Sequence, residues 1–190
     1  MDTKGILIAG VGGQGILLAS DILCRVLMVA GLDVNKSEVH GMAQRGGSVT
    51  SHVRFGDRVY SPLSKKRDVD ILVSFEKMDT LRYLDYLKKD GSVIINSEEL
   101  YPPAVNLGDA TYLSDAVETV KRLFPKVKSV DAKALAIQAG NIRAVNAVLL
   151  GTLSAFLPIA IEIWENVLKE ALPSRVLAAN REAFSLGRKV

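Results

Sequence analysis

The segment that most constrains the fold is a glycine-rich stretch with the sequence GVGGQG at residues 10–15. The short apolar run before it, residues 5–9, is typical of a strand buried on both faces of a parallel sheet. After it, leucine and isoleucine recur at helical spacing over residues 16–27, and Gly31 supplies a helix stop. The pattern predicts a strand, a tight turn and a helix, and residues 34–39 predict a second strand that completes a βαβ opening.

The middle of the chain predicts an antiparallel insertion followed by a return to buried strands. Residues 48–55 alternate between apolar and polar side chains, Gly56 and Asp57 mark a turn, and residues 58–63 are expected to be the hairpin partner. Further strands are predicted at residues 69–75, 92–96 and 127–130, with helices at 78–87 and 116–124. The first of these helices would turn Leu81, Leu84 and Leu87 inward and end near Gly91.

The last third of the chain predicts helices at residues 132–139, 143–157, 162–171 and 174–186, with Ser174 as the cap of the last one. The helix at 143–157 is apolar nearly all round, so it either completes the core or docks a partner subunit. The uncharged stretch around it, residues 144–161, is at the lower limit for a membrane span. Asn146 and Pro158 are among the residues that interrupt this stretch, so a buried helix is expected and no membrane association.

The simplest account is one α/β domain over residues 1–190, with a Rossmann-like open, mainly parallel sheet. An antiparallel hairpin is inserted into this sheet, and the region from about residue 132 to 190 is helical. The apolar start of the chain resembles an export signal, but its glycines and the lack of a small-residue cleavage pattern favour a strand, turn and helix. A cytoplasmic location is therefore expected.

Composition excludes several classes of function. The net charge is only +3 and the basic residues are dispersed, which does not favour nucleic-acid binding. The single cysteine, Cys24, excludes an internal disulfide framework and indicates a reducing compartment. One thiol also cannot hold an iron–sulfur cluster, which needs about four thiolates. The two histidines, His40 and His52, do not have a metal-binding spacing, so no metal site is predicted.

The glycine segment is the first candidate for chemistry. Gly10, Gly12 and Gly15 satisfy the pattern G-x-G-x-x-G between a predicted strand and a predicted helix. Glycine lets backbone N–H groups approach an anion, and a helix N-terminus attracts negative charge. Glu38 lies near the end of the second strand, where a ribose-binding acid could stand. The alternative is that the glycines only permit a tight turn and close helix–strand packing.

A second candidate loop, residues 40–47, follows the second strand. It contains three glycines and Arg45, at the strand end where open α/β sheets bind ligands. Arginine carries a permanent charge on a planar fork that suits carboxylates and phosphates. Gly46 and Gly47 would let the backbone approach the bound group or the first glycine loop. The alternatives are a surface turn with a solvated arginine and, for His40, either a structural position or proton transfer.

Four spaced motifs together carry a family resemblance. The motifs follow each other over nearly the whole chain. The first is residues 10–15, and the second is residues 44–48 with the alternating residues 52–55. The third is residues 69–76, and the fourth is Gly140-Asn141 with Asn146 and Leu150-Gly151. In this the chain resembles the gamma domain of the 2-oxoacid:ferredoxin oxidoreductases. Within that family, residues 39–49 and the stand-alone length look most like the beta subunit of the indolepyruvate enzymes.

The resemblance implies oxidative decarboxylation of a 2-oxoacid to an acyl-coenzyme A, with electrons passing to ferredoxin. Thiamine diphosphate and [4Fe–4S] clusters would lie on a large alpha subunit, so this chain would hold no cofactor firmly and be inactive alone. Coenzyme A would be the cosubstrate, and the chain would offer an anion-attracting rim to the partner's active site. The residues expected at this rim are Gly10, Gly12, Gly13, Gln14, Gly15, Gln44, Arg45, Gly46 and Gly47.

Three other hypotheses stay open at this point. The chain could be the gamma subunit of a related enzyme that acts on pyruvate, ketoisovalerate or 2-oxoglutarate. It could be a self-sufficient NAD(P)-dependent enzyme that uses the first glycine loop, although the loop at residues 40–47 argues against this. It could also be a non-catalytic nucleotide- or anion-binding module that needs no partner.

Overall fold

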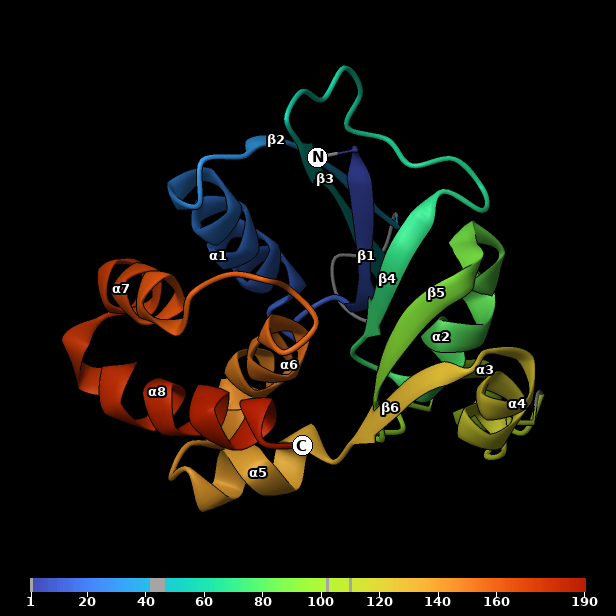
Figure 1. Cartoon of the computed structure of the whole chain (residues 1–190). Helices are drawn as coiled ribbons and strands as arrows, with labels where there is room; N and C mark the ends of the chain where they lie inside the picture. The colour runs from blue at the N-terminus through green and yellow to red at the C-terminus, as the bar shows by residue number, and fades with distance from the viewer. Residues whose placement is uncertain (1, 42–46, 102, 110) are drawn as a thin grey trace.

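The computed structural model describes residues 2–41, 47–101, 103–109 and 111–190 (Figure 1). Its strands are β1 (Lys4–Val11), β2 (Asp33–His40), β3 (Ser48–Gly56), β4 (Val69–Ser74), β5 (Leu87–Asn96) and β6 (Lys126–Val130). Its α-helices are α1 (Ile16–Val29), α2 (Lys77–Tyr83), α3 (Pro103–Asn106), α4 (Ala116–Leu123), α5 (Ala132–Gln138), α6 (Val145–Ser154), α7 (Ile161–Ala171) and α8 (Ser174–Arg188). Short 3₁₀ turns lie at η1 (Leu84–Tyr86) and η2 (Ile142–Ala144).

The six strands form one mixed sheet in the order β2-β3-β1-β4-β5-β6. β1, β4, β5 and β6 are parallel neighbours, whereas β3 is antiparallel to both β1 and β2. The predicted fold class, an open and mainly parallel sheet with an inserted antiparallel hairpin, is confirmed. Strand β3 lies between β1 and β2, so β1 and β2 are not direct neighbours as they would be in a simple βαβ opening.

The predicted hairpin partner of β3 was wrong. Residues 58–63 form no strand, and β3 pairs instead with β2, which precedes it. Side chains of β2 form hydrogen bonds with the backbone of Val59, which a strand at residues 58–63 would have used to pair with β3. The carboxylate of Asp33 accepts a hydrogen bond from the Val59 N–H at 2.7 Å, and the Asn35 amide donates to the Val59 carbonyl at 2.8 Å. The segment is held as a loop over the end of β2.

Two further boundaries differ from the sequence prediction. The helix expected to reach residue 87 ends at Tyr83, and β5 begins at Leu87, which pairs with Val69 and is buried. Gly91, expected to stop a helix, lies inside β5 with the side chain of Leu87 packed against it. Ser174 is the first residue of α8 and provides no side-chain cap; Pro173 occupies the cap position. The early start of β5 comes from the tertiary packing of Leu87, which overrides the local helical signal.

Helices cover the two faces of the sheet unequally (Figure 1). α1 and α5 to α8 lie on one face, and α2 and α4 lie on the other. β1 shows the division, because Ile6 and Ile8 join the larger apolar cluster while Leu7 and Ala9 join the smaller one. Strand residues alternate between faces, so a fully apolar strand is required where both faces are covered.

Helix α6 completes the core, which was one of the two readings of its all-round apolar sequence. Its residues from Asn146 to Ser154 are buried within this chain. α6 crosses α8 at two glycines: a Cβ atom on Gly151 would come within 2.1 Å of the Phe184 carbonyl, and one on Gly187 within 2.0 Å of the Val148 carbonyl. Within the described residues, no helix is long and apolar enough to cross a membrane.

Candidate functional site at the carboxyl edge of the sheet

The glycine loop joins β1 to α1 at the carboxyl edge of the parallel strands. Gly13 and Gly15 have φ values of +104° and +84°, which favour glycine. Gly10 is required for another reason: a Cβ atom there would lie 2.7 Å from the Phe75 Cβ atom at the end of β4. Packing therefore accounts for Gly10, and backbone conformation accounts for Gly13 and Gly15.

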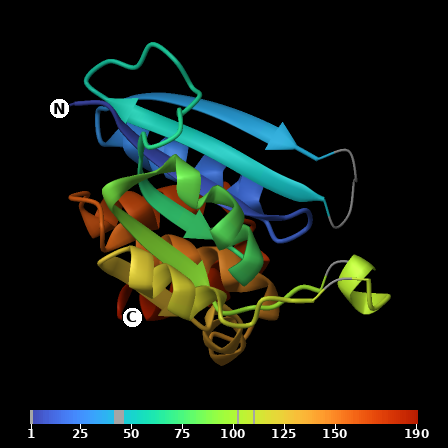
Figure 2. The ribbon, with the colours of Figure 1, turned by 90° about the vertical axis from the view of Figure 1, so that its right-hand side faces the viewer.

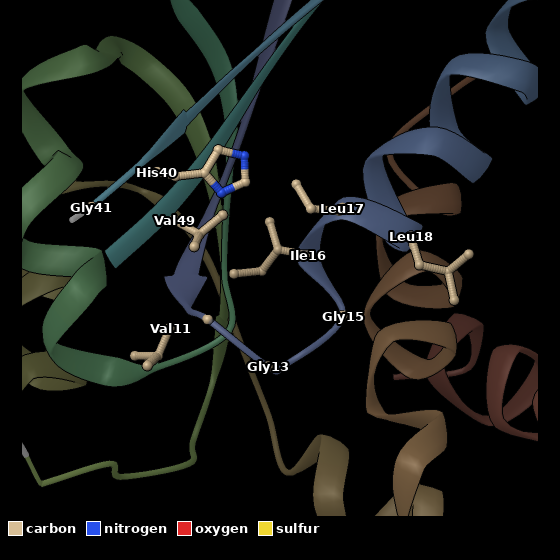
Figure 3. A pocket seen from close by; sticks show the side chains of 10 residues that line it. Val11, Gly13, Gly15, Ile16, Leu17, Leu18, His40, Gly41 and Val49 are labelled. Carbon is tan, nitrogen blue, oxygen red and sulfur yellow. The ribbon is translucent and has the colours of Figure 1, made fainter. Parts of the chain in front are cut away.

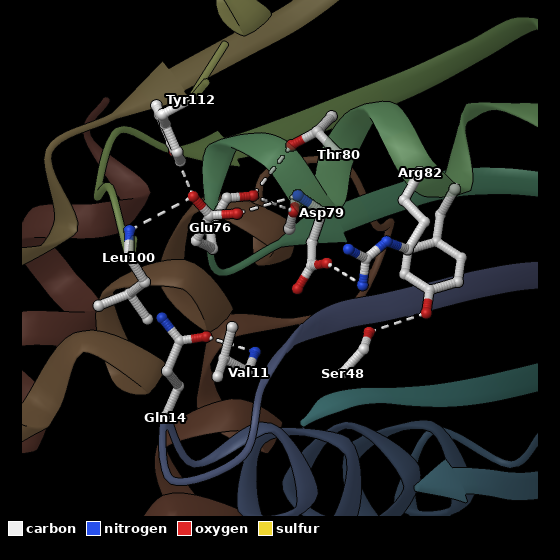
Figure 4. A network of polar contacts seen from close by, with 11 residues as sticks. Val11, Gln14, Ser48, Glu76, Asp79, Thr80, Arg82, Leu100 and Tyr112 are labelled. Atoms are coloured by element: carbon white, nitrogen blue, oxygen red, sulfur yellow. Dashed lines mark hydrogen bonds and ion pairs between the residues drawn. The ribbon is translucent and has the colours of Figure 1, made fainter. Parts of the chain in front are cut away.

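The side chain of Gln14 turns into the protein and fixes the loop (Figure 4). Its carbonyl oxygen accepts from the Val11 N–H at 2.8 Å, and its amide donates to the Phe75 carbonyl at 3.0 Å and to the Glu98 carboxylate at 3.4 Å. Gln14 thus ties the loop to the ends of β4 and β5. Sequence reasoning assigned it to a ligand, whereas these bonds occupy both ends of its amide.

The second candidate loop lies beside the first. The Gly12 N–H donates to the Gly47 carbonyl at 2.9 Å, and the Gly41 N–H donates to the Ser48 carbonyl at 2.9 Å. Gly47 is therefore brought against the glycine loop. Gln44, Arg45 and Gly46 lie outside the described residues.

A cavity of about 650 Å³ opens between these loops on the α1 side of the sheet (Figure 3). The glycine loop and the first turn of α1 form one wall, and His40, Gly41 and Val49 form the other. Ile16, Leu17 and Leu18 make the lining largely apolar. In the described part of the chain, no side chain caps the N-terminus of α1, and no acidic residue lies in its first turn. The cavity suits a ligand with an apolar body and a negative group near this helix N-terminus.

His40 at the cavity wall belongs to a row of ionisable side chains on β2. Lys36 binds Asp21 at 2.5 Å and Glu38 at 2.6 Å, and the His40 Nε2 atom lies 3.3 Å from Glu38. The hydrogen bond from Lys36 lowers the pKa of Glu38. Because β3 separates β2 from β1, Glu38 is two strands away from the glycine loop, about 10 Å by ordinary strand spacing. It therefore does not occupy the neighbouring-strand position of a ribose-binding acid.

A buried polar network that the sequence reasoning missed lies on the other side of the glycine loop (Figure 4). Glu76 lies two residues after the end of β4 and is almost fully buried. One of its carboxylate oxygens caps α2 by accepting from the Asp79 N–H at 2.9 Å. The other accepts from the Leu100 N–H and the Tyr112 hydroxyl. Burial and the Glu76 carboxylate raise the pKa of Tyr112, so the phenol stays protonated.

Asp79 is the second buried acid of this network. One oxygen pairs with Arg82 at 3.1 Å, and the other has no hydrogen-bond partner in the part of the chain that the structure describes. Burial raises the pKa of Asp79. The available sequence signal for this network was an acid close after a buried strand, Glu76 two residues after β4. The ends of parallel strands meet at the ligand-binding edge of the sheet.

The single thiol, Cys24, is in an environment that makes it unreactive. Cys24 lies in α1 within the larger core, and burial raises its pKa to about 11. A thiol is a poor metal ligand or nucleophile while it stays protonated. Among the described residues, no group of three or more His, Cys, Asp or Glu side chains is placed to hold a metal ion.

The sheet and its glycine-lined carboxyl edge define an α/β protein of the Rossmann-like type. More narrowly, the chain belongs to the pyruvate ferredoxin/flavodoxin oxidoreductase family, whose model matches residues 5–190. The predicted family is thus confirmed.

The chain is similar to two named subunits in sequence and to one solved structure in fold. The chain is 41% identical over 196 residues to the indolepyruvate oxidoreductase subunit IorB of Pyrococcus horikoshii, covering 100% of this chain and 96% of that protein. It is 27% identical to the pyruvate/ketoisovalerate oxidoreductases common subunit gamma of Pyrococcus abyssi, covering 92% of each. Its fold matches the 2-oxoglutarate:ferredoxin oxidoreductase of Magnetococcus marinus, solved with 2-oxoglutarate, coenzyme A and succinyl-CoA. The TM-score is 0.74 at 23% identity, over 100% of this chain and 31% of that one.

Proposed function

We propose that this chain is the beta subunit of an indolepyruvate:ferredoxin oxidoreductase, which converts an aryl pyruvate and coenzyme A to an acyl-coenzyme A and carbon dioxide. The observation that carries this proposal is the full-length 41% identity to the IorB subunit, against 27% to a pyruvate/ketoisovalerate gamma subunit. The separation of these two values favours the indolepyruvate branch over the other 2-oxoacid enzymes. A cytoplasmic location and electron delivery to ferredoxin belong to the same proposal.

The redox and decarboxylation chemistry belongs, in this proposal, to cofactors on a large partner subunit. Thiamine diphosphate would supply the carbanion chemistry, and iron–sulfur clusters would carry the electrons. The residues of this chain do not fit a cluster, because its single thiol is buried in the core with a raised pKa. The contribution of this chain is then to bind and orient anionic substrates at the edge of the partner's active site.

The carboxyl edge described above is the proposed rim for these anions. Gly12, Gly13 and Gly15 line the cavity beside the N-terminus of α1, which no side chain of the described residues caps, and a helix N-terminus attracts negative charge. From the sequence, Gln44, Arg45, Gly46 and Gly47 would add a second wall with a fixed positive charge. The combination of a positive rim and an apolar cavity supports binding of a carboxylate or of coenzyme A, which carries phosphates on an extended body.

Reconstitution tests the proposed function. The isolated chain is expected to bind no iron and to show no activity. Co-expression with a large subunit that carries thiamine diphosphate and clusters should give indolepyruvate- and coenzyme A-dependent reduction of ferredoxin. Turnover by the isolated chain, or tight nicotinamide binding by it, would favour the self-sufficient enzyme instead.

Arg45→Ala in the assembled complex tests the rim. Loss of one charge-assisted contact is expected to raise KM for coenzyme A or the oxoacid roughly ten-fold or more, since such a contact contributes about 1.5–3 kcal/mol. Lys66→Ala is the matched control, because it removes the same charge at an exposed site before β4, away from the carboxyl edge. Unchanged kinetics for both substrates in Arg45→Ala would remove the proposed role of this loop.

A further inference from the structure

The connection between β5 and α4 stands off the body of the protein (Figure 2). We call the described residues 97–101, 103–109 and 111–115 the arm; it includes the short helix α3. The arm projects from the side of the molecule where the parallel strands end, which is also the side of the hairpin between β2 and β3 (Figure 2). Its position places it next to the proposed active-site rim.

The arm exposes large apolar side chains. Leu107 is 76% exposed, and Tyr101 and Leu113 are 52% and 50% exposed. Hydrogen bonds inside the arm give it a defined shape: the Asn106 amide donates to the Tyr101 carbonyl, and the Asp109 N–H donates to the Ala104 carbonyl. A shaped projection with uncovered leucines is typical of a surface that packs on another protein.

The root of the arm, in contrast, is bound to the body at several points. Lys77 binds Glu99 at 2.7 Å, and Tyr101 packs edge-on against Tyr112 with ring centroids 4.9 Å apart. Tyr112 in turn donates to Glu76. Glu98 binds Gln14 of the glycine loop at 3.4 Å. Whatever binds the tip is therefore held at a fixed position relative to the glycine loop.

Charge indicates the kind of partner. The arm contains four acidic residues, Glu98, Glu99, Asp109 and Asp115, and no Lys or Arg. The remaining chain has 24 basic and 21 − 4 = 17 acidic residues. The net charge of +3 is therefore the sum of a negative arm and a positive body. Glu99 and Asp115 already pair with Lys77 and Arg122 of the body, and Asp109 lies just after α3 at the tip. A complementary partner has an apolar hollow for leucines with a lysine or arginine at its rim.

We propose that the arm is the docking element for the large cofactor-bearing subunit, with Leu107 and Leu113 seated in an apolar hollow that has a basic rim. This inference rests on the proposed function, which supplies the large subunit. We assign the large subunit to this surface because a protein docked on the arm faces the glycine loop. The proposed function requires the cofactors of the large subunit to lie beside that loop. A second copy of this chain in that place would cover the same edge and bring no cofactor.

The test uses the complex of this chain with its large subunit. Leu107→Ser with Leu113→Ser should weaken the affinity at least ten-fold, and raised salt should weaken the wild-type complex. Leu63→Ser is the matched control: Leu63 is 51% exposed but lies in the loop before β4, at the opposite edge of the sheet. The control should bind like the wild type, and both variants should keep the wild-type circular dichroism spectrum and melting temperature, which excludes misfolding.

The outcomes separate the two proposals. Equal affinity of the wild type and the double variant, in an active complex, would overturn the docking role of the arm and leave the proposed function intact. Failure of the wild-type chain to bind any large subunit would overturn both. Self-association of the isolated chain that the double variant abolishes, with large-subunit affinity unchanged, would assign the arm to a second copy and overturn the proposal.

Discussion

The two faces of the sheet are built differently, and the difference separates stability from function. On one face, α1 and α5 to α8 enclose a continuous apolar core that includes Trp164 and Phe184. On the other face, α2 and α4 cover a core of only eight buried residues, beside a polar network around Glu76. Buried apolar area is the main source of folding free energy. The first face should therefore hold the fold, while the second can carry buried acids and a projecting arm.

The largest effect is expected on the first face, from Trp164→Ala. Trp164 is fully buried in α7, with its ring centroid 5.6 Å from that of Phe184. Its removal leaves a large cavity, so the free energy of unfolding should fall by about 3–5 kcal/mol. Urea unfolding followed by circular dichroism measures this loss of stability. The control is Lys169→Ala, which changes an exposed residue of the same helix. A loss below about 1 kcal/mol would show that the first face is not the main core.

Gly187→Ala tests the close crossing of α6 and α8 on the same face. A methyl group at this position would meet backbone rather than a movable side chain, 2.0 Å from the Val148 carbonyl oxygen. The helices must separate, and a cost of about 1–3 kcal/mol is expected although alanine is the better helix former. Glu182→Ala, exposed on α8, should stay within about 0.5 kcal/mol of the wild type. A stabilised Gly187→Ala protein in thermal melts would contradict the observed crossing.

On the second face, Glu76→Gln should cost about 1–3 kcal/mol. The carboxylate accepts from two backbone N–H groups and from the Tyr112 hydroxyl, and a glutamine must turn an NH₂ group toward one of these donors. The matched control is Glu99→Gln, which weakens the partly exposed contacts of Glu99 with Lys77 and with the Tyr101 hydroxyl and should cost less than about 1 kcal/mol. Equal melting temperatures for the two variants would mean that the network is not a second, polar centre of stability.

The same contrast explains what the sequence could predict. Continuous apolar runs and helical periodicity located β1, α1, β4 and α6, because local pattern and buried environment agree there. The pairing of β3 with β2 was missed, because the competing turn at Gly56 and Asp57 gives the stronger local hairpin signal. The order of strands in a sheet depends on contacts between residues that are distant in the sequence. The periodicity of apolar residues carries no information about such contacts.

The candidate site was predictable in part, for a related reason. Glycines that need positive φ, such as Gly13 and Gly15, are marked by residue type alone. The inward turn of Gln14 depends on the Phe75 carbonyl and Glu98, which lie 61 and 84 residues away. The Glu76 network likewise joins residues from α2 and the arm. Such long-range hydrogen bonds produce no periodic pattern in a single sequence, so they could not be predicted from it.

The smallest expected effect is a pH dependence on the second face, at His52. Its side chain is buried on β3, with its ring 5.7 Å from that of Tyr86, and burial lowers its pKa from 6.5. The unfolded chain therefore binds a proton below about pH 6.5 that the folded chain resists, so stability falls as the pH drops through this range. Each unit of difference between the two pKa values corresponds to about 1.4 kcal/mol.

His52→Gln should remove this component, so the variant loses less stability than the wild type between pH 7 and pH 5. His40→Gln is the matched control, because its side chain is about half exposed at the cavity wall, with the Glu38 carboxylate 3.3 Å away. Urea midpoints at three pH values measure the slopes. Parallel slopes for the wild type and His52→Gln would mean that the folded protein admits the charged imidazole, and that the second face is wetter than its packing around Tyr86 indicates.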